Sequence, residues 1–287
     1  MAESAANRVS KADLKGKTIL VTGSTDGVGR WVAERLGARG ARFLVHGRDP
    51  NRGEALVETI KQGGGAAAFL PADLSALAEV RALSDAVRRE TDRLDVLVNN
   101  AGIGTAGNVR EVSADGFELR FGVNYLAGFL LTRLLLPLLE KRAPSRIVNV
   151  ASAGQQAVDF DDVMLTRGYS GVRAYCQSKL AQILFTIDLA EELKASGVTV
   201  NALHPATYMD TTMVRRAGAH PISTVEEGGE AILQLVASPM LEGRSGLYFN
   251  GQREARADAQ AYDPAARKRL RSLSFGLVGL ADPVAAP

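Results

Sequence analysis

The feature that most constrains the fold is the regular alternation of short apolar blocks with apolar residues at helical spacing. The first block, Thr18 to Thr22, is β-branched and apolar, which predicts a buried strand. A helical pattern follows as far as Leu36, Gly40 closes it, and a second strand is expected over 42–46. Strands that are apolar throughout need helices on both faces, so the alternation predicts a parallel sheet of the doubly wound kind.

The alternation continues along the chain and fixes the expected domain organisation. Further helices are predicted at about 52–61, 77–89, 115–139, 175–194 and 226–236, and further strands at 67–70, 94–98, 146–150, 198–203 and 247–249. Together they predict a single α/β domain of the Rossmann type, with about seven strands. The expected parts are a polar arm (1–15), a catalytic domain (16–252) with a substrate lid near 206–224, and an extension (253–287). This extension is expected to be a surface tail with one helical piece at 265–273.

Composition and charge exclude several classes of function. The net charge is +2 with basic residues spread along the chain, so a nucleic-acid-binding face is not expected. Cys176 is the single cysteine, which rules out an internal disulfide and fits a cytoplasmic location. The stretch 129–139 is shorter than the roughly 20 apolar residues that span a bilayer, so no membrane span is expected. Acidic residues at 159–162 have no histidine or cysteine beside them, so no metal site is expected.

A glycine-rich loop follows the first strand and opens a helix. Glycines there let the backbone approach a pyrophosphate, and the N–H groups at a helix start attract phosphate. Glycines also close ordinary strand-to-helix loops, and this spacing differs from that of the common dinucleotide fingerprint, so the loop alone does not decide. The candidate cofactor-binding residues are Gly23, Ser24, Thr25, Asp26, Gly27, Val28 and Gly29.

The end of the second strand bears on the choice of nucleotide. An acidic side chain placed there would bond the ribose hydroxyls of NAD, whereas an arginine suits the extra phosphate of NADP. Arg48 therefore indicates NADP, and Asp49 leaves NAD open. The alternative reading of Arg48 is a solvated side chain at the start of a loop.

Tyr175 and Lys179 are four residues apart on a predicted helix and so share a face. At about 4 Å and an effective dielectric of about 20, an ammonium attracts a phenolate by about 4 kcal/mol, which would lower the phenol pKa by up to about three units. That shift would let Tyr175 exchange protons near neutral pH. Alone, the pair occurs by chance in many helices, and its meaning depends on other motifs.

Six segments in order resemble the short-chain dehydrogenase/reductase family. The segments are Thr22 to Gly29, Asn99 to Gly102, Val123-Asn124, Ile147 to Ser152, Tyr175 to Lys179 and His204 to Thr207. The resemblance runs from about residue 16 to 249. Ala174 to Thr186 and the long segment between Ser152 and Tyr175 are most similar to the retinol-dehydrogenase-like branch, which implies a lipophilic, low-polarity small-molecule substrate.

The resemblance implies an oxidoreductase that moves a hydride between NADP(H) and a carbonyl or alcohol carbon. Tyr175 would be the general acid and base, and Ser152 would hold the carbonyl oxygen. Lys179 would lower the phenol pKa and bond the nicotinamide ribose, while Asn124 would anchor a water linked to Lys179. Besides Tyr175 and Lys179, the resemblance assigns cofactor contacts to Asp73, Leu74, Asn100, Ala101, Gly102, Pro205 and Thr207. It also implies pairing through two long helices into a homodimer or homotetramer.

Two departures and two alternatives accompany this interpretation. Ala206 and Ala151 stand where the family usually has glycine and serine, and neither change removes a catalytic group. One alternative is a catalytically silent NADP-binding or sensing protein, which the presence of all four candidate catalytic side chains argues against. The other is a sugar-nucleotide epimerase or dehydratase, which the glycine spacing and the lack of a sizeable carboxyl-terminal substrate domain argue against.

Overall fold

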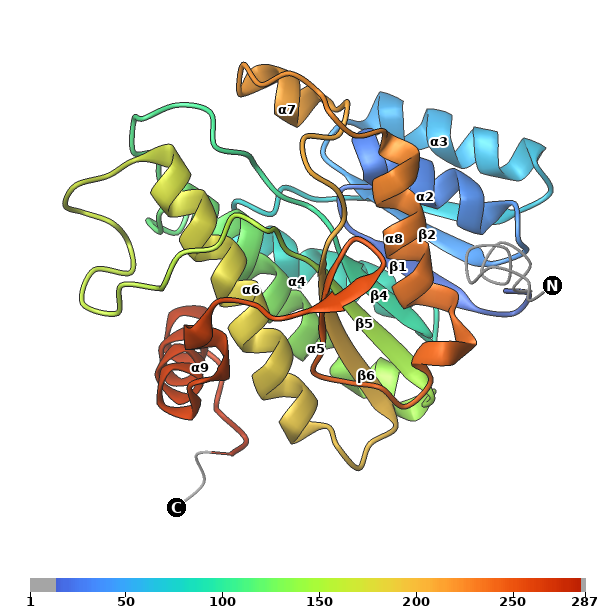
Figure 1. Cartoon of the computed structure of the whole chain (residues 1–287). Helices are drawn as coiled ribbons and strands as arrows, with labels where there is room; N and C mark the ends of the chain where they lie inside the picture. The colour runs from blue at the N-terminus through green and yellow to red at the C-terminus, as the bar shows by residue number, and fades with distance from the viewer. Residues whose placement is uncertain (1–13, 285–287) are drawn as a thin grey trace, which may run out of the picture.

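A computed structural model describes residues 14–284 and contains one eight-stranded sheet (Figure 1). Its order is β3-β2-β1-β4-β5-β6-β7-β8, with every neighbouring pair parallel except β7 and β8. The strands are β1 (Thr18–Val21), β2 (Arg42–Gly47), β3 (Ala66–Pro71), β4 (Val96–Asn99), β5 (Ser145–Val150), β6 (Val198–His204), β7 (Tyr248–Asn250) and β8 (Arg253–Ala255). The predicted doubly wound α/β fold is confirmed, with one antiparallel strand more than expected.

Helices cover both faces of the sheet. The principal ones are α2 (Gly27–Gly37), α3 (Pro50–Gln62), α4 (Leu77–Glu90), α5 (Ala127–Lys141), α6 (Gly171–Glu192), α7 (Thr212–Arg216), α8 (Val225–Ala237) and α9 (Pro264–Val278). Short turns are the π-helical η1 (Phe121–Leu126) and the 3₁₀ turns η2 (Pro239–Leu241) and η3 (Ala259–Tyr262). One apolar core joins the sheet to α2, α3 and α8, and the other joins it to α4, α5, α6 and α9.

Two predicted helix starts differ from the structure. The helix expected from 175 begins at Gly171, where the Ser170 side chain accepts a hydrogen bond from the Arg173 amide as an N-cap. The helix expected from 115 begins only at Phe121, because Val112 and Glu118 form an isolated β-bridge that closes a turn before it. Tyr175 consequently lies in the second turn of α6 and not at its start.

The carboxyl-terminal residues are not the surface tail that the sequence predicted. The β8 strand extends the sheet, and α9 packs beside α6 (Figure 1). The Tyr125 and Ser274 hydroxyls lie 2.6 Å apart, and the Phe275 ring meets Phe129 edge-on at 5.2 Å between centroids. Helical periodicity was visible there, but the buried face of α9 is recognisable only when its partners are in place. The predicted polar arm lies outside the described residues except for its last two.

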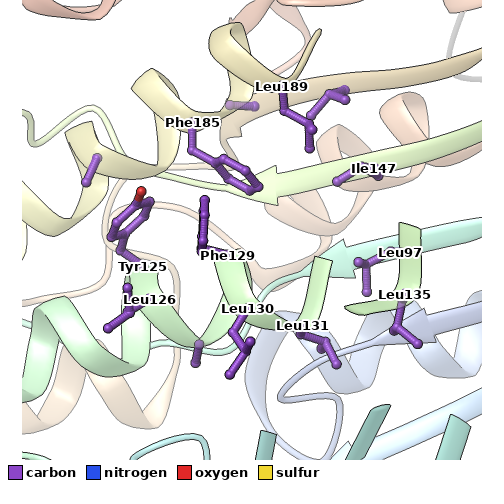
Figure 2. Close-up of a cluster of buried hydrophobic side chains, with 14 of the residues drawn as sticks. Leu97, Tyr125, Leu126, Phe129, Leu130, Leu131, Leu135, Ile147, Phe185 and Leu189 are labelled. Carbon is purple, nitrogen blue, oxygen red and sulfur yellow. The ribbon is translucent and has the colours of Figure 1, made fainter. Parts of the chain in front are cut away.

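Aromatic and aliphatic side chains of η1, α5 and α6 fill the core beneath α9. Figure 2 shows Tyr125, Phe129 and Phe185 facing one another between these helices. The segment Phe121–Lys141 is long and apolar enough to cross a membrane by length and composition, but 67% of its apolar window is buried inside this domain. It is thus accounted for as a core helix. Because α9 lies against α6 and contacts Phe129 of α5, the two long helices expected to pair between subunits are partly covered from within the chain.

Candidate active site

The candidate residues follow the carboxyl ends of β1, β4, β5 and β6, which are neighbours in the sheet. The strand order reverses at β1 and β4, and ligands of doubly wound sheets bind outside such a reversal. The site therefore lies where loops from both halves of the sheet meet.

The glycine loop between β1 and α2 has room only for glycine at two positions. Gly23 has a φ of +64°, and a Cβ on it would lie 2.9 Å from the Ala101 Cα. A Cβ on Gly29 would lie 2.3 Å from the Gly23 carbonyl oxygen. The loop backbone therefore lies close to the amino end of α2. Together they form a cradle that fits the pyrophosphate of a dinucleotide.

Side chains from neighbouring strands hold this cradle. The Thr22 hydroxyl accepts hydrogen bonds from the Asn100 and Ala101 amides, each at 3.0 Å. The Asn100 side-chain amide donates to the Thr22 carbonyl at 2.8 Å and to the Gly23 carbonyl at 3.2 Å. The predicted cofactor residue Asn100 therefore fixes the loop with both its side chain and its backbone amide.

His46 also supports the cradle and was missed by the sequence analysis. Its Nδ1 accepts a hydrogen bond from the Gly23 amide at 2.9 Å. Burial lowers the pKa of His46 to about 4, which keeps the ring neutral and Nδ1 able to accept. The available signal was a histidine at the end of a strand that is otherwise apolar.

The ends of β2 and β3 bring Arg48 beside Asp73. Their charged atoms lie 3.7 Å apart, and both side chains are substantially exposed. Leu74 is buried in the core, with 6% of its surface exposed. Arg52 of α3 lies 3.4 Å from Asp26 of the glycine loop and 3.6 Å from Asp49, so this edge carries two arginines and three carboxylates.

The Tyr175, Ser152 and Lys179 side chains come together at the ends of β5 and α6. The Ser152 hydroxyl lies beside the Tyr175 phenol and acts to lower its pKa. A Cβ on Gly154 would lie 3.5 Å from the Ser152 Oγ and 3.8 Å from a ring carbon of Tyr175, so both side chains border this glycine. The Lys179 Nζ lies 5.8 Å from the centre of the Tyr175 ring.

The electrostatics of this group differ from the sequence-based expectation. Burial raises the pKa of Tyr175, with the Ser152 hydrogen bond opposing it, and burial lowers the pKa of Lys179 to about 7. The Coulomb argument assumed an ammonium about 4 Å from the phenolate. In the fold both groups are withdrawn from water, and desolvation disfavours the charged form of each. The protein alone therefore does not show the predicted lowering of the phenol pKa.

Lys179 and Asn124 have separate hydrogen-bond partners. The Lys179 ammonium donates to the Val150 carbonyl at 2.9 Å and to the Gln182 Oε1 at 3.0 Å. The Asn124 amide donates to the Ser178 hydroxyl and the Ile103 carbonyl, while its oxygen accepts from the Ile103 amide. The water-mediated link from Asn124 to Lys179 stays a prediction, and Gln182 is a neighbour that the sequence analysis missed.

The carboxyl-terminal segment supports the loop that carries Ser152. Tyr248 and Gln155 both donate side-chain hydrogen bonds to the Ser152 carbonyl, at 3.1 and 2.9 Å. The side chain of Gln260 in η3 forms two hydrogen bonds with the Val158 backbone. Its oxygen accepts one from the Val158 amide at 2.7 Å, and its nitrogen donates one to the Val158 carbonyl at 3.1 Å. Gln260, which follows the predicted catalytic domain, thus helps to position the loop between β5 and α6.

A buried polar cluster fixes the loop after β4. Arg120 has 4% of its surface exposed and donates to the Gly104 carbonyl at 2.7 Å and the Ala106 carbonyl at 2.5 Å. It also contacts the Tyr169 hydroxyl, which donates to Glu118 at 3.0 Å. The loop beside the site is therefore tied to the segment that precedes α6.

The segment predicted as a lid reaches over two sides of the site. A Cβ on Gly104 would meet Met213 of α7 at 2.8 Å, and a Cβ on Gly27 would meet Thr211 at 3.3 Å. Thr207 bonds the His204 ring at 3.0 Å just after β6 and Pro205. The lid segment therefore contacts both the glycine loop and the loop after β4.

Other candidate groups have ordinary structural explanations. Arg215 pairs with Asp210 at 2.8 Å on the surface of the lid. Burial raises the pKa of the Cys176 thiol, so it stays protonated. Within residues 14–284 no three histidine, cysteine or acidic side chains are grouped to hold a metal ion.

Comparison with known proteins agrees with this geometry. The sequence profile of the family described as short chain dehydrogenase matches residues 17–221. The chain belongs to the short-chain dehydrogenase family. The resemblance drawn from the six motifs is thereby confirmed, and so is the retinol-dehydrogenase-like branch. Human retinol dehydrogenase 13 is 39% identical over 298 residues, covering 96% of this chain and 88% of the human protein.

Two solved structures of other proteins share the architecture of this short-chain dehydrogenase. An uncharacterised protein of Mycobacterium paratuberculosis is 29% identical with a TM-score of 0.79, covering 96% of this chain and 98% of that one. The landomycin C-6 ketoreductase LanV, solved with NADP and rabelomycin, is 28% identical with a TM-score of 0.67, covering 84% and 96%. The protein is thus an alcohol or carbonyl oxidoreductase of a family that uses NAD(P).

Proposed function

We propose that this enzyme transfers a hydride between NADP(H) and the carbonyl or alcohol carbon of a low-polarity small molecule, with Tyr175 carrying the proton. The observation that carries the proposal is the meeting of the Tyr175 phenol, the Ser152 hydroxyl and the Lys179 ammonium at the sheet edge that holds the glycine cradle. These groups are the donors that a carbonyl reduction requires at the substrate oxygen.

The nicotinamide ring, when bound, supplies or receives the hydride. During reduction the substrate oxygen gains negative charge, and hydrogen bonds from Tyr175 and Ser152 would stabilise it more strongly in the transition state than in the ground state. Tyr175 then gives its proton to that oxygen and becomes a phenolate. Lys179, in its charged form, stabilises this phenolate. In alcohol oxidation the same phenolate takes the proton back.

The preference for NADP is supported by Arg48. Its guanidinium follows β2, at the position where a doubly wound sheet meets the adenosine ribose, and a guanidinium suits a phosphate. The LanV structure contains NADP. The neighbouring Asp73 carboxylate would oppose a phosphate at close range, so partial use of NAD is the alternative that cofactor titrations should test.

A low-polarity substrate is supported by the lid. Tyr208, Met213 and Ile222 of this segment expose 54%, 38% and 70% of their surfaces, although they are apolar or aromatic. The relatives named retinol dehydrogenase and the ketoreductase solved with rabelomycin also support a low-polarity substrate.

A cytoplasmic location and a homodimeric or homotetrameric state are part of the proposal. Pairing of subunits through the long helices would have to accommodate α9, which lies against α6.

The test is Tyr175→Phe, which keeps the ring and removes the proton. General acid–base catalysis contributes about 10²- to 10⁴-fold, so kcat for carbonyl reduction should fall by that range while NADPH binding stays close to normal. Tyr262→Phe, a ring in the carboxyl-terminal segment, is the matched control. Near-wild-type turnover in Tyr175→Phe would refute the proposed role. Tight NADPH binding with no turnover of any ketone, aldehyde or alcohol by the wild type would favour the sensing alternative.

A further inference from the structure

The Lys179 ammonium has three N–H donors, and the protein occupies two of them. One goes to the Val150 carbonyl at the end of β5, and the other goes to the side-chain oxygen of Gln182. One donor is left for the site. The direction of that remaining donor depends on both acceptors, and only Gln182 contributes its acceptor through a side chain.

Gln182 is unusual in its surroundings. It lies three residues after Lys179 on the same side of α6, with 3% of its surface exposed. Leu180, Ala181, Ile183 and Leu184 around it in the sequence have no exposed surface. A buried side-chain amide is costly unless it has hydrogen-bond partners, so an amide here in place of an aliphatic side chain points to a specific partner.

Lys179 has little other support for its positive charge. The titratable groups that face it are Tyr175 on α6 and His204 at the end of β6. Burial and Lys179 both lower the pKa of His204, so this ring is neutral. Burial is the cause of the lowered pKa of Lys179, about 7, and no carboxylate of the described chain offsets it. Near neutral pH the lysine is therefore balanced between ammonium and amine, and a neutral acceptor at 3.0 Å favours the ammonium.

We propose that Gln182 is a positioning residue of this enzyme, whose side-chain oxygen holds the Lys179 Nζ charged and directed toward Tyr175 and the cofactor site. The proposal rests on the proposed function for its catalytic consequence, because a charged Lys179 matters only if Tyr175 carries a proton. Its structural part, the coupling of Gln182 to Lys179, stands independently of the reaction.

The first experiment measures the coupling without turnover. Full-length protein labelled with ¹³C at lysine Cε is titrated by NMR, and the Lys179 signal is assigned with Lys179→Met. A hydrogen bond to a charged group corresponds to about one to two pKa units. The isosteric Gln182→Met should therefore lower the pKa of Lys179 by about that amount, and Gln182→Glu should raise it. Gln234→Met, on the other face of the sheet in α8, should leave it unchanged.

The second experiment follows kcat for carbonyl reduction against pH. Gln182→Met should lose more than about tenfold at pH 7.5, with the loss shrinking toward pH 6 as Lys179 regains its proton, and Gln182→Glu should recover most of kcat. A Lys179 titration that is unchanged in both Gln182 variants, or a pH profile of Gln182→Met that superimposes on the wild type, would overturn the proposal. A wild type that never turns over, but whose Lys179 titration shifts as described, would instead reject the proposed function and keep the coupling.

Discussion

Replacing Lys179 with methionine should abolish catalysis and make the protein more stable at neutral pH. The pKa of this lysine falls from 10.5 to about 7 because folding removes the ammonium from water. At about 1.36 kcal/mol per unit, this shift corresponds to about 5 kcal/mol of stability that the protein forgoes below pH 7. Methionine has a similar length and carries no charge to desolvate.

The gain is smaller than this figure, because two acceptors lose their donor. The Val150 carbonyl and the Gln182 side-chain oxygen would each be left unsatisfied, at about 1 to 3 kcal/mol apiece. Access of water to the site after the substitution would reduce these costs. With each of these costs held to about 1 to 2 kcal/mol in this way, the expected net stabilisation at pH 7 is about 1 to 3 kcal/mol.

The dependence on pH is the sharper test. Between pH 7 and 10.5 the unfolded lysine holds a proton that the folded lysine has released, so raising the pH stabilises the wild type relative to the variant. The difference in unfolding free energy should therefore be largest at or below pH 7 and should shrink by about 2 kcal/mol by pH 9. Urea denaturation of both proteins at pH 7, 8 and 9 measures it.

A matched control separates burial from charge. Lys141→Met removes an exposed lysine at the end of α5 and should show no such dependence on pH. A stability difference between wild type and Lys179→Met that is flat from pH 7 to 9 would show that Lys179 is not desolvated as described. The mechanism proposed for Tyr175 and the role proposed for Gln182 would then lose their electrostatic basis.

Three further predictions concern the packing of α9 and the periphery of the site. Arg271→Met should destabilise the fold by about 3 to 5 kcal/mol in urea denaturation, because Asp188, Glu192 and Asp282 would lose their buried cation; unfolding at the wild-type midpoint would contradict this. Gln260→Leu should raise KM for the carbonyl substrate while leaving the NADPH Kd unchanged, since it releases the loop at Val158; equal changes in both constants would indicate general destabilisation. Arg48→Ala should lower the preference for NADPH over NADH by about tenfold in kcat/KM, and an unchanged ratio would reject Arg48 as the phosphate ligand.

The sequence predicted the features that depend on local patterns. Periodicity located the strands of the parallel sheet, since a buried strand must be apolar along its whole length. The glycine loop could be recognised from the sequence because a Cβ at Gly23 or Gly29 would clash with neighbouring backbone, so only glycine fits at these positions. Tyr175 and Lys179 were found as a pair because helical spacing puts them on one face.

Tertiary structure decided what depends on distant partners. The burial of α9 arises from Tyr125 and Phe129, about 150 residues away, so its periodicity could not distinguish a surface helix from a core helix. His46 and Gln182 gained their roles only when folding brought Gly23 and Lys179 to their side chains. The sequence predicted a lowered pKa for Tyr175, whereas burial of the phenol in the folded domain raises it. Sequence spacing gives the separation of charges along a helix, whereas the exclusion of water, which sets the cost of a charge, is a property of the whole packed domain.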